Sequence, residues 1–212
     1  MDLQLLIDAV IEGDAPKAEA LVNEALSEGL EPATIVNDGL IAAMGTIGER
    51  FGRGEIYVPE MLYSARAMQT GLTILEPLLA AGGGVVRKAV VIGTVKGDVH
   101  DIGKNIVGIM LKGAGFTVYD LGVDVPAERF VSAVREHQPD LVGLSALLTT
   151  TMPAMRSVIE ALELEGLRDS VKVIVGGAPV TEEFAEMIGA DGYGTDAGAA
   201  ATCAKELLQV SV

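Results

Sequence analysis

The 212-residue sequence has few cysteines, histidines and aromatic residues: it contains one cysteine, two histidines and no tryptophan, and aromatic residues make up 4% of it. The single Cys203 permits neither an internal disulfide nor a zinc site built from several cysteines. It falls in an alanine-rich stretch typical of a helix, where we expect a small buried hydrophobic residue. The shortage of aromatic residues also leaves no platform on which nucleic-acid bases could stack.

The sequence also lacks an excess of positive charge and any long apolar run. Fifteen Lys and Arg against thirty Asp and Glu give a net charge of -15, which repels phosphate backbones and anionic membranes and predicts no nucleic-acid and no membrane partner. Gly or charge interrupts the apolar stretches before the roughly 18 residues of a membrane span, and the N-terminus has no basic region followed by an apolar segment. With half of its residues hydrophobic, we expect a globular cytoplasmic protein with a sizeable core.

The first part of the chain, up to about Leu79, places its apolar residues at helical spacing and shows no strand pattern. Four helices fit, the last over residues 59–79, and a four-helix bundle is their simplest packing. The boundaries between them are marked by acidic residues before proline and by glycine; these signals are Asp14 with Pro16, Gly29, and Glu31 with Pro32.

Three glycines, Gly82, Gly83 and Gly84, then interrupt the helical pattern. Glycine favours no regular structure and permits a change of direction. We place a domain boundary here, with a helical domain and its glycine-rich linker over residues 1–84 and a second domain over residues 85–212.

The second domain alternates short β-branched runs with helical segments, which predicts parallel strands buried on both faces. Strands are expected at residues 90–95, 116–121, 141–145, 171–175 and 192–193, and helices at residues 102–112, 127–136, 152–162, 182–187 and 197–208. The fold class is therefore α/β, with a flavodoxin-like, doubly wound sheet of five parallel strands. In such a sheet, ligands bind beyond the carboxyl ends of the strands, between the first and the third.

The stretch GDVHDIGKN, residues 97–105, occupies that edge and places His100 between Asp98 and Asp101. A phosphate-binding loop is disfavoured, because Asn105 stands where Ser or Thr is needed and the spacing of the glycines is one residue too long. A metal site built from Asp98, His100 and Asp101 is also disfavoured, because consecutive loop residues rarely converge on one ion and the only other histidine, His137, lies at the end of a helix.

A third interpretation is that His100 is a single axial ligand to a metal already held in a macrocycle, with Asp98 accepting the other ring N–H. The structural alternative is a histidine that only satisfies its own loop. Small residues at the ends of the third and fourth strands, Ser145 and Gly176-Gly177, leave room for a long ligand. Taken alone, the two glycines also fit a tight turn. The histidine loop and the small residues after the third and fourth strands lie on one edge of the sheet, however, and together they favour a slot.

These residues resemble the cobalamin-binding signature of methionine synthase, adenosylcobalamin mutases and corrinoid methyl carriers. The pattern Asp98-x-His100-x-x-Gly103 is followed after 41 residues by Ser145-x-Leu147 and after a further 28 by Gly176-Gly177. The first domain resembles the helical cap that covers the cofactor in methionine synthase, through FGRGEIYVP at residues 51–59 and SARAM at residues 64–68.

The resemblance implies that His100 ligates the cobalt of cobalamin or a related corrinoid, that Asp98 accepts the imidazole N–H, and that Thr151 stands where methionine synthase has a serine. In the cap, Phe51 would shield the upper face, while Val58 replaces the leucine usual in methionine synthase; Met44, Met61 and Met68 would face the ring or form bundle core. The residues implied at the cofactor are Gly97, Asp98, Val99, His100, Asp101, Ile102 and Gly103 in the loop, Ser145, Leu147, Thr149, Gly176 and Gly177 along the nucleotide tail, Ala197 in the last loop, and Phe51, Val58 and Met44 in the cap.

The resemblance also implies a function: a corrinoid protein that carries a methyl group on cobalt and is not catalytic alone. Its expected partners are a substrate:corrinoid methyltransferase, a corrinoid:acceptor methyltransferase that uses tetrahydrofolate or coenzyme M, and a reductive activator. The alternative is a cobalamin-dependent regulator or light sensor, although no basic helix-turn-helix segment is present. A mutase subunit would commonly lack the cap, and a response-regulator receiver would need acidic residues that are missing here.

Overall fold

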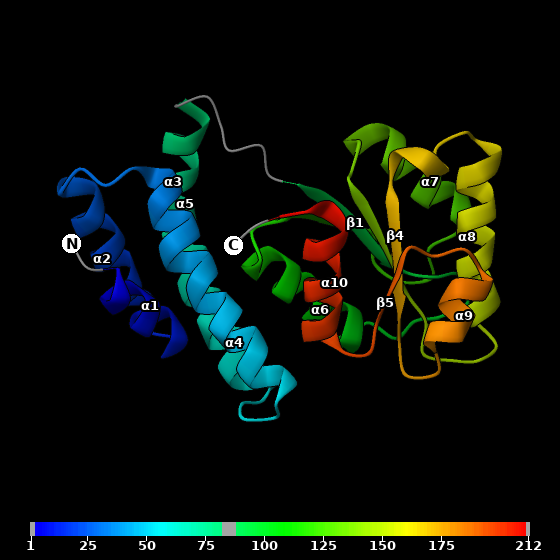
Figure 1. Cartoon of the computed structure of the whole chain (residues 1–212), viewed down its shortest axis with the longest axis horizontal. Helices are drawn as coiled ribbons and strands as arrows, with labels where there is room; N and C mark the ends of the chain where they lie inside the picture. The colour runs from blue at the N-terminus through cyan, green and yellow to red at the C-terminus, as the bar shows by residue number, and fades with distance from the viewer. Residues whose placement is uncertain (1–2, 82–87, 211–212) are drawn as a thin grey trace. The chain divides into compact units, whose positions relative to one another are not determined.

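The computed structural model describes residues 3–81 and 88–210. These residues fall into two compact units, a helical one before Lys88 and an α/β one that begins there. The expected linker at Gly82 to Gly84 lies outside the described residues, so the domain limits 1–84 and 85–212 stay a prediction. Each unit is described by itself, with the element labels of Figure 1.

The helical unit forms because four apolar helical stretches bury their inner faces against one another. Its elements are α1 (Gln4–Ile11), α2 (Ala15–Ser27), the continuous run α3 (Pro32–Thr34), η1 (Ile35–Ile41) and α4 (Ala42–Gly52), and α5 (Val58–Ala81). The predicted start of α2 is confirmed, because the Asp14 side chain accepts a hydrogen bond from the Lys17 N–H at 3.0 Å. Helix α5 packs along α2, and its buried Ser64 hydroxyl donates to the Ile11 carbonyl at 3.1 Å.

One feature of this unit was not predicted: residues Ile35–Ile41 form a π-helix. The third predicted helix therefore consists of α3, η1 and α4, which follow one another without a break, and its middle part is π-helical. Such stretches are rare and commonly occur where a helix has a special task. From Val36 and Leu40 inside it to Ala43, Met44 and Ile47 in α4, the buried apolar residues recur every three or four positions, which is why the sequence pattern did not show it.

The α/β unit is a five-stranded parallel sheet with strand order β2-β1-β3-β4-β5, as predicted for a flavodoxin-like fold. Its strands are β1 (Ala89–Thr94), β2 (Thr117–Asp120), β3 (Leu141–Ser145), β4 (Lys172–Gly176) and β5 (Gly192–Gly194). Its helices are α6 (Ile102–Gly113), α7 (Ala127–His137), α8 (Met152–Leu164), α9 (Glu182–Met187) and α10 (Ala197–Leu208), with a short 3₁₀ turn η2 (Arg168–Ser170) before β4.

Helices cover both faces of this sheet: α7, α8 and α9 lie on one side, and α6 and α10 on the other (Figure 1). Between the sheet and α7, α8 and α9 lies a continuous core centred on the fully buried Phe130 and Met155. Because both faces are covered, β1 and β3 consist of buried residues with little polar alternation.

The order of the strands places the ends of β1, β3 and β4 side by side. Thr94 pairs with Ser145, and Ser145 pairs with Gly176. Just beyond the ladder, the Val95 N–H donates to the Ser145 carbonyl at 3.0 Å. Strand β2 lies on one side of β1, and β3 lies on the other side. The loops after β1 and β3 therefore leave the sheet beside each other, at the point where the strand order reverses.

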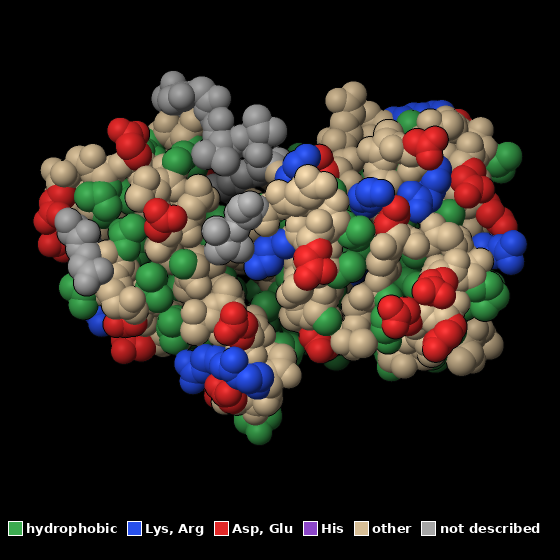
Figure 2. Space-filling view, viewed as in Figure 1, with side chains coloured by type: hydrophobic (Ala, Val, Ile, Leu, Met, Phe, Trp, Pro, Cys, Tyr) green, Lys and Arg blue, Asp and Glu red, His purple; other side chains and the backbone are tan. Residues whose placement is uncertain are grey.

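Charged side chains are spread over the face of the molecule in Figure 2 rather than gathered in one acidic patch. A basic group marks the turn after α4 (Figure 2), where Arg53 pairs with Glu49 and Glu55, and Arg50 with Glu55. In the described part of the chain, no helix combines the length and the hydropathy that crossing a membrane requires.

Candidate functional site

His100 lies on the loop that joins β1 to α6, and Asp98 holds it at two points. Its backbone N–H donates to the Asp98 Oδ1 at 3.0 Å, and its ring Nδ1 lies 2.7 Å from the same oxygen. Because this carboxylate accepts, Nδ1 is the protonated ring nitrogen and Nε2 carries the free lone pair. The His100 side chain is 47% exposed, and within residues 3–81 and 88–210 its Nε2 has no hydrogen-bond partner.

Asp98 is fully buried and accepts four hydrogen bonds. Besides the two from His100, its Oδ2 accepts from the Leu147 N–H and from the Thr151 hydroxyl, each at 2.7 Å. Burial by itself would raise the pKa of Asp98, but the hydrogen bonds from His100, Leu147 and Thr151 hold this pKa well below its ordinary value. The carboxylate is therefore ionised at neutral pH, and it fixes both the tautomer and the direction of the imidazole.

Two residues that the sequence analysis did not single out complete the frame of this loop. The Asp124 side chain accepts from the Gly97 N–H at 2.7 Å, and the Asp124 N–H donates to the Asp98 carbonyl at 2.8 Å. The Thr94 hydroxyl donates to the His100 carbonyl at 2.8 Å. Gly97 has a φ of +84°, a conformation that glycine adopts without steric cost. The loops after β1, β2 and β3 are thus hydrogen-bonded to one another around Asp98.

Two glycines, Gly176 at the end of β4 and Gly177 after it, lie where the sequence predicted a slot. Gly177 has a φ of +130°, and a Cβ atom there would lie 1.9 Å from the Ala146 carbonyl oxygen. A Cβ on Gly176 would lie 3.0 Å from the Gly194 carbonyl oxygen. Gly177 is therefore required by the packing of the turn itself, and both glycines keep side chains away from this edge. These close approaches support the tight turn, and the slot for a long ligand stays a prediction.

Large apolar side chains are exposed around His100, on the same edge of the sheet. Soluble proteins rarely expose several such side chains together unless they bind something apolar. A flat, largely hydrophobic macrocycle with one axial position open to an imidazole fits this surface and this donor set. The exposed side chains are Val99 (69%) and Ile102 (76%) next to the histidine, and Leu147 (42%) and Leu148 (43%) after β3. Of these, Leu148 was not predicted.

The remaining predicted residues of the α/β unit lie on the same loops. Asp101 and Gly103 are exposed at the start of α6, and Thr149 is exposed in the loop before α8. Ala197 is the buried first residue of α10. Their contacts with a cofactor stay predictions.

In the helical unit, Phe51 lies near the end of α4 and Val58 at the start of α5, so one short turn separates them. Both are half-buried, whereas Met44 on α4 is buried. Met61 and Met68 on α5 are buried as well. The contact of Phe51, Val58 and Met44 with a cofactor stays a prediction.

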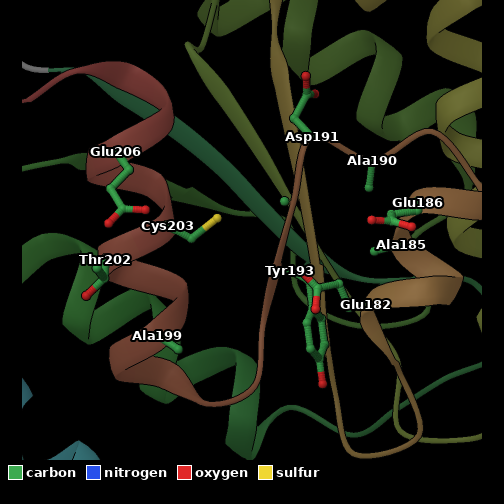
Figure 3. A pocket seen from close by; sticks show the side chains of 11 residues that line it. Glu182, Ala185, Glu186, Ala190, Asp191, Tyr193, Ala199, Thr202, Cys203 and Glu206 are labelled. Carbon is green, nitrogen blue, oxygen red and sulfur yellow. The ribbon is translucent and has the colours of Figure 1, made fainter.

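A cavity of about 490 Å³ lies elsewhere in the α/β unit, between α9 and α10 (Figure 3). It contains none of the predicted cofactor residues. The expectation that Cys203 is a buried hydrophobic residue was wrong in degree, because its side chain is only partly buried and lines this cavity. Its sulfur points from α10 toward β5 (Figure 3), and burial raises the pKa of the thiol.

A metal site made of several protein ligands is not supported. Within the residues that the structure describes, no group of three or more His, Cys, Asp or Glu side chains could hold an ion. His137 stacks on Tyr119 instead, with ring centroids 3.9 Å apart and planes 6° from parallel. A single exposed imidazole suits a metal whose other ligands are supplied by a macrocycle.

Comparison with known proteins identifies the cofactor. Residues 88–202 match a family model described as a B12 binding domain, and residues 3–76 match a second model with the same description. Both matched regions are thus domains of a cobalamin-binding protein. The chain is 47% identical to the dimethylamine corrinoid protein of Methanosarcina barkeri, over 97% of both sequences. It belongs to the corrinoid proteins, which confirms the predicted family, and it binds cobalamin or a related corrinoid.

Solved structures agree with this assignment. A cobalamin-binding protein from Desulfitobacterium hafniense superposes with a TM-score of 0.78 at 35% identity, over 97% of this chain and 98% of that one. The methanol:cobalamin methyltransferase complex MtaBC from Methanosarcina barkeri contains a chain that superposes with a TM-score of 0.86 at 31% identity, covering 99% of this chain and 80% of that one.

Proposed function

We propose that this protein carries a methyl group on the cobalt of its corrinoid, from a substrate-specific methyltransferase to a second methyltransferase that passes it to an acceptor. The observation that carries the proposal is His100, whose Nε2 lone pair is exposed while Nδ1 is held 2.7 Å from a fully buried carboxylate. When bound, the corrinoid supplies the cobalt that takes up and releases the methyl group.

The residues of the chain hold and tune this centre. His100 would ligate the cobalt through its Nε2, and Asp98, by accepting the Nδ1–H, would make the imidazole a stronger ligand. The hydroxyl of Thr151 lies 2.7 Å from the Asp98 Oδ2 and 2.9 Å from the Leu148 carbonyl. Its single hydrogen can therefore bond to either oxygen, so Thr151 can adjust the charge that Asp98 presents to the ring.

Other residues of the two units exclude water and make room for the cofactor. Val99, Ile102 and Leu147 are exposed and would present apolar surface to the macrocycle, and Gly176 and Gly177 would line its nucleotide tail without side chains. Phe51, Val58 and Met44 in the helical unit would shield the opposite face of the corrinoid, and Ala197 would lie near the end of the tail.

The names of the relatives support the proposed partners. One relative is named a dimethylamine corrinoid protein, and another similar chain belongs to a methanol:cobalamin methyltransferase complex. These names support a substrate methyltransferase as the first partner, with a methylated amine as the first donor to test. The second partner would methylate tetrahydrofolate or coenzyme M, and a reductive activator would restore oxidised cobalt.

Reconstitution with hydroxocobalamin tests the proposal. The wild type should retain the corrinoid and show visible absorption features that disappear in His100→Ala. His137→Gln removes the second histidine, which stacks on Tyr119, and should leave these features unchanged. Loss of corrinoid by the wild type, or identical spectra for wild type and His100→Ala, would contradict the proposed ligation.

Transfer then separates a carrier from a sensor. The loaded protein is mixed with a methylamine:corrinoid methyltransferase and its substrate, and methylation is followed by the visible spectrum. A carrier becomes methylated and loses the methyl group when an acceptor methyltransferase and tetrahydrofolate or coenzyme M are added. A sensor would retain its corrinoid but undergo neither reaction.

A further inference from the structure

Thr94 is the last residue of β1, and its side chain is fully buried beneath the histidine loop. Its hydroxyl donates to the carbonyl of His100 at 2.8 Å, across six residues of chain. The bond joins a strand of the core directly to the residue that carries the exposed imidazole.

The Thr94 end of this bond is held rigidly by the sheet. Its N–H donates to the Gly122 carbonyl and its carbonyl accepts from the Val125 N–H, both at 3.0 Å. On its other side Thr94 pairs with Ser145 of β3. The hydroxyl therefore projects from a backbone that neighbouring chain fixes on both sides, and a threonine side chain has few rotamers to choose from.

The His100 end is held from two directions. Asp98 accepts the backbone N–H and the ring Nδ1 of His100, while Thr94 donates to the carbonyl. The bonds to Asp98 fix the ring relative to the carboxylate. The bond from Thr94 fixes the following peptide group, and so the position of the His100 Cα from which the ring extends. A shift of about 1 Å at such a position is enough to impair a ligand or catalytic group.

We propose that Thr94 is a positioning residue for the axial ligand: its hydroxyl sets the height and direction of the His100 Nε2 beneath the corrinoid. This inference rests on the proposed ligation of cobalt by His100. If Thr94 were only structural, its substitution would lower the free energy of unfolding and leave the bond between His100 and cobalt unchanged. If Thr94 is a positioning residue, its substitution weakens that bond.

The test compares three variants of the full chain, each loaded with hydroxocobalamin and reduced to the cobalt(II) state. Thr94→Val keeps the shape of the side chain but removes the hydroxyl, Thr94→Ser keeps the hydroxyl, and Val91→Ala removes fully buried packing from the same strand without touching the bond. The protein is labelled with ¹⁵N-histidine, so a cobalt-bound imidazole gives a two-line nitrogen splitting in the electron paramagnetic resonance spectrum, whereas the ¹⁴N of the cofactor's own dimethylbenzimidazole gives a three-line splitting. His100→Ala is the reference for loss of the two-line splitting.

We expect Thr94→Val to lower the ratio of His-bound to His-free cobalt about fivefold, the range that one neutral hydrogen bond supports. Thr94→Ser and Val91→Ala should keep the wild-type ratio. The inference is overturned if Thr94→Val keeps the wild-type ratio, or if Val91→Ala lowers it by as much. Should Thr94→Val fail to fold, Thr94→Ala replaces it.

A second measurement on the cofactor-free protein does not depend on cobalt. The His100 ring should give one set of ¹⁵N resonances in the wild type and in Thr94→Ser, and broadened or multiple resonances in Thr94→Val. Wild-type resonances in Thr94→Val would overturn the role of Thr94. If the wild type and His100→Ala show the same cobalt spectrum, the proposed ligation by His100 is wrong. Thr94 then positions no cobalt ligand, even if the cofactor-free measurement gives the expected result.

Discussion

The imidazole Nδ1 of His100 and the carboxylate Oδ1 of Asp98 lie 2.7 Å apart, with a single residue between them in the chain. The same oxygen also accepts the backbone N–H of His100. A short local loop thus fixes a ring that points out of the protein, while the second oxygen of the carboxylate is anchored by the loop after β3.

Asp98→Asn should weaken both the fold and the ligand. An amide cannot accept at its nitrogen, so donors now paired with one carboxylate oxygen lose their acceptor and a buried group is left unsatisfied. We expect a loss of about 2 kcal/mol or more in the free energy of unfolding, and a weaker bond between His100 and cobalt. Urea unfolding and the visible spectrum check these two effects. The exposed Asp169 supplies the control: Asp169→Asn should change neither.

Stability should depend on pH through Asp98 in a defined direction. Its pKa is lowered in the folded protein, so the unfolded state binds more protons between the folded and the unfolded pKa. The contribution of Asp98 is therefore complete above the ordinary carboxyl pKa and is lost as the pH falls toward the folded one. Urea unfolding of wild type and Asp98→Asn from neutral to acidic pH should give a stability difference that shrinks with acidification. A difference that stays constant would contradict this.

Thr151→Val should raise the pKa of Asp98, because it removes one of the four donors to the carboxylate. The expected loss of stability at neutral pH is about 1 kcal/mol. Thr151→Ser retains the hydroxyl and should behave as wild type. Acid titration of the unfolding free energy measures the shift, and equal titrations for Thr151→Val and wild type would argue against a role for the hydroxyl.

Gly177→Ala should be strongly destabilising. The new Cβ would lie 1.9 Å from the Ala146 carbonyl oxygen, at a φ of +130°, and we expect a loss of about 3 kcal/mol or more, as for other strained backbone positions. Gly45→Ala on α4 is the control, since nothing lies within 4 Å of its Cβ position; it should leave stability unchanged or raise it. Urea unfolding and corrinoid retention distinguish the two variants.

Cys203 should react slowly with a thiol reagent in the folded protein. Burial raises the pKa of its thiol, so less thiolate is present at neutral pH, and its side chain is only partly accessible from the cavity. The rate of reaction with Ellman's reagent should rise by at least tenfold in denaturant. Equal rates in both conditions would show that the thiol is accessible in the native state.

Much of the fold could be predicted because the sequence carries direct physical signals for it. Strands buried on both faces lack polar alternation, so β1 and β3 were found nearly to the residue, and the glycines that end β4 marked the edge of the sheet. The π-helix Ile35–Ile41 was missed because its apolar residues keep α-helical spacing.

Within the site, the sequence pointed to the local pair of Asp98 and His100 and, through family resemblance, to Thr151. It did not point to Thr94 or Asp124. These two residues bond to backbone atoms of the histidine loop, and a side chain that bonds to a distant main chain leaves no pattern of spacing or residue type in the sequence.

The bonds to Asp98 also determine when the site can form during synthesis. The amide of Leu147 and the hydroxyl of Thr151 reach this carboxylate across 49 and 53 residues. A nascent chain from which β3 has not yet emerged would contain the local pair of Asp98 and His100 but lack the two donors that anchor the second carboxylate oxygen. We therefore expect corrinoid uptake to require that β3 and the loop after it have assembled, which is a late, long-range step of folding.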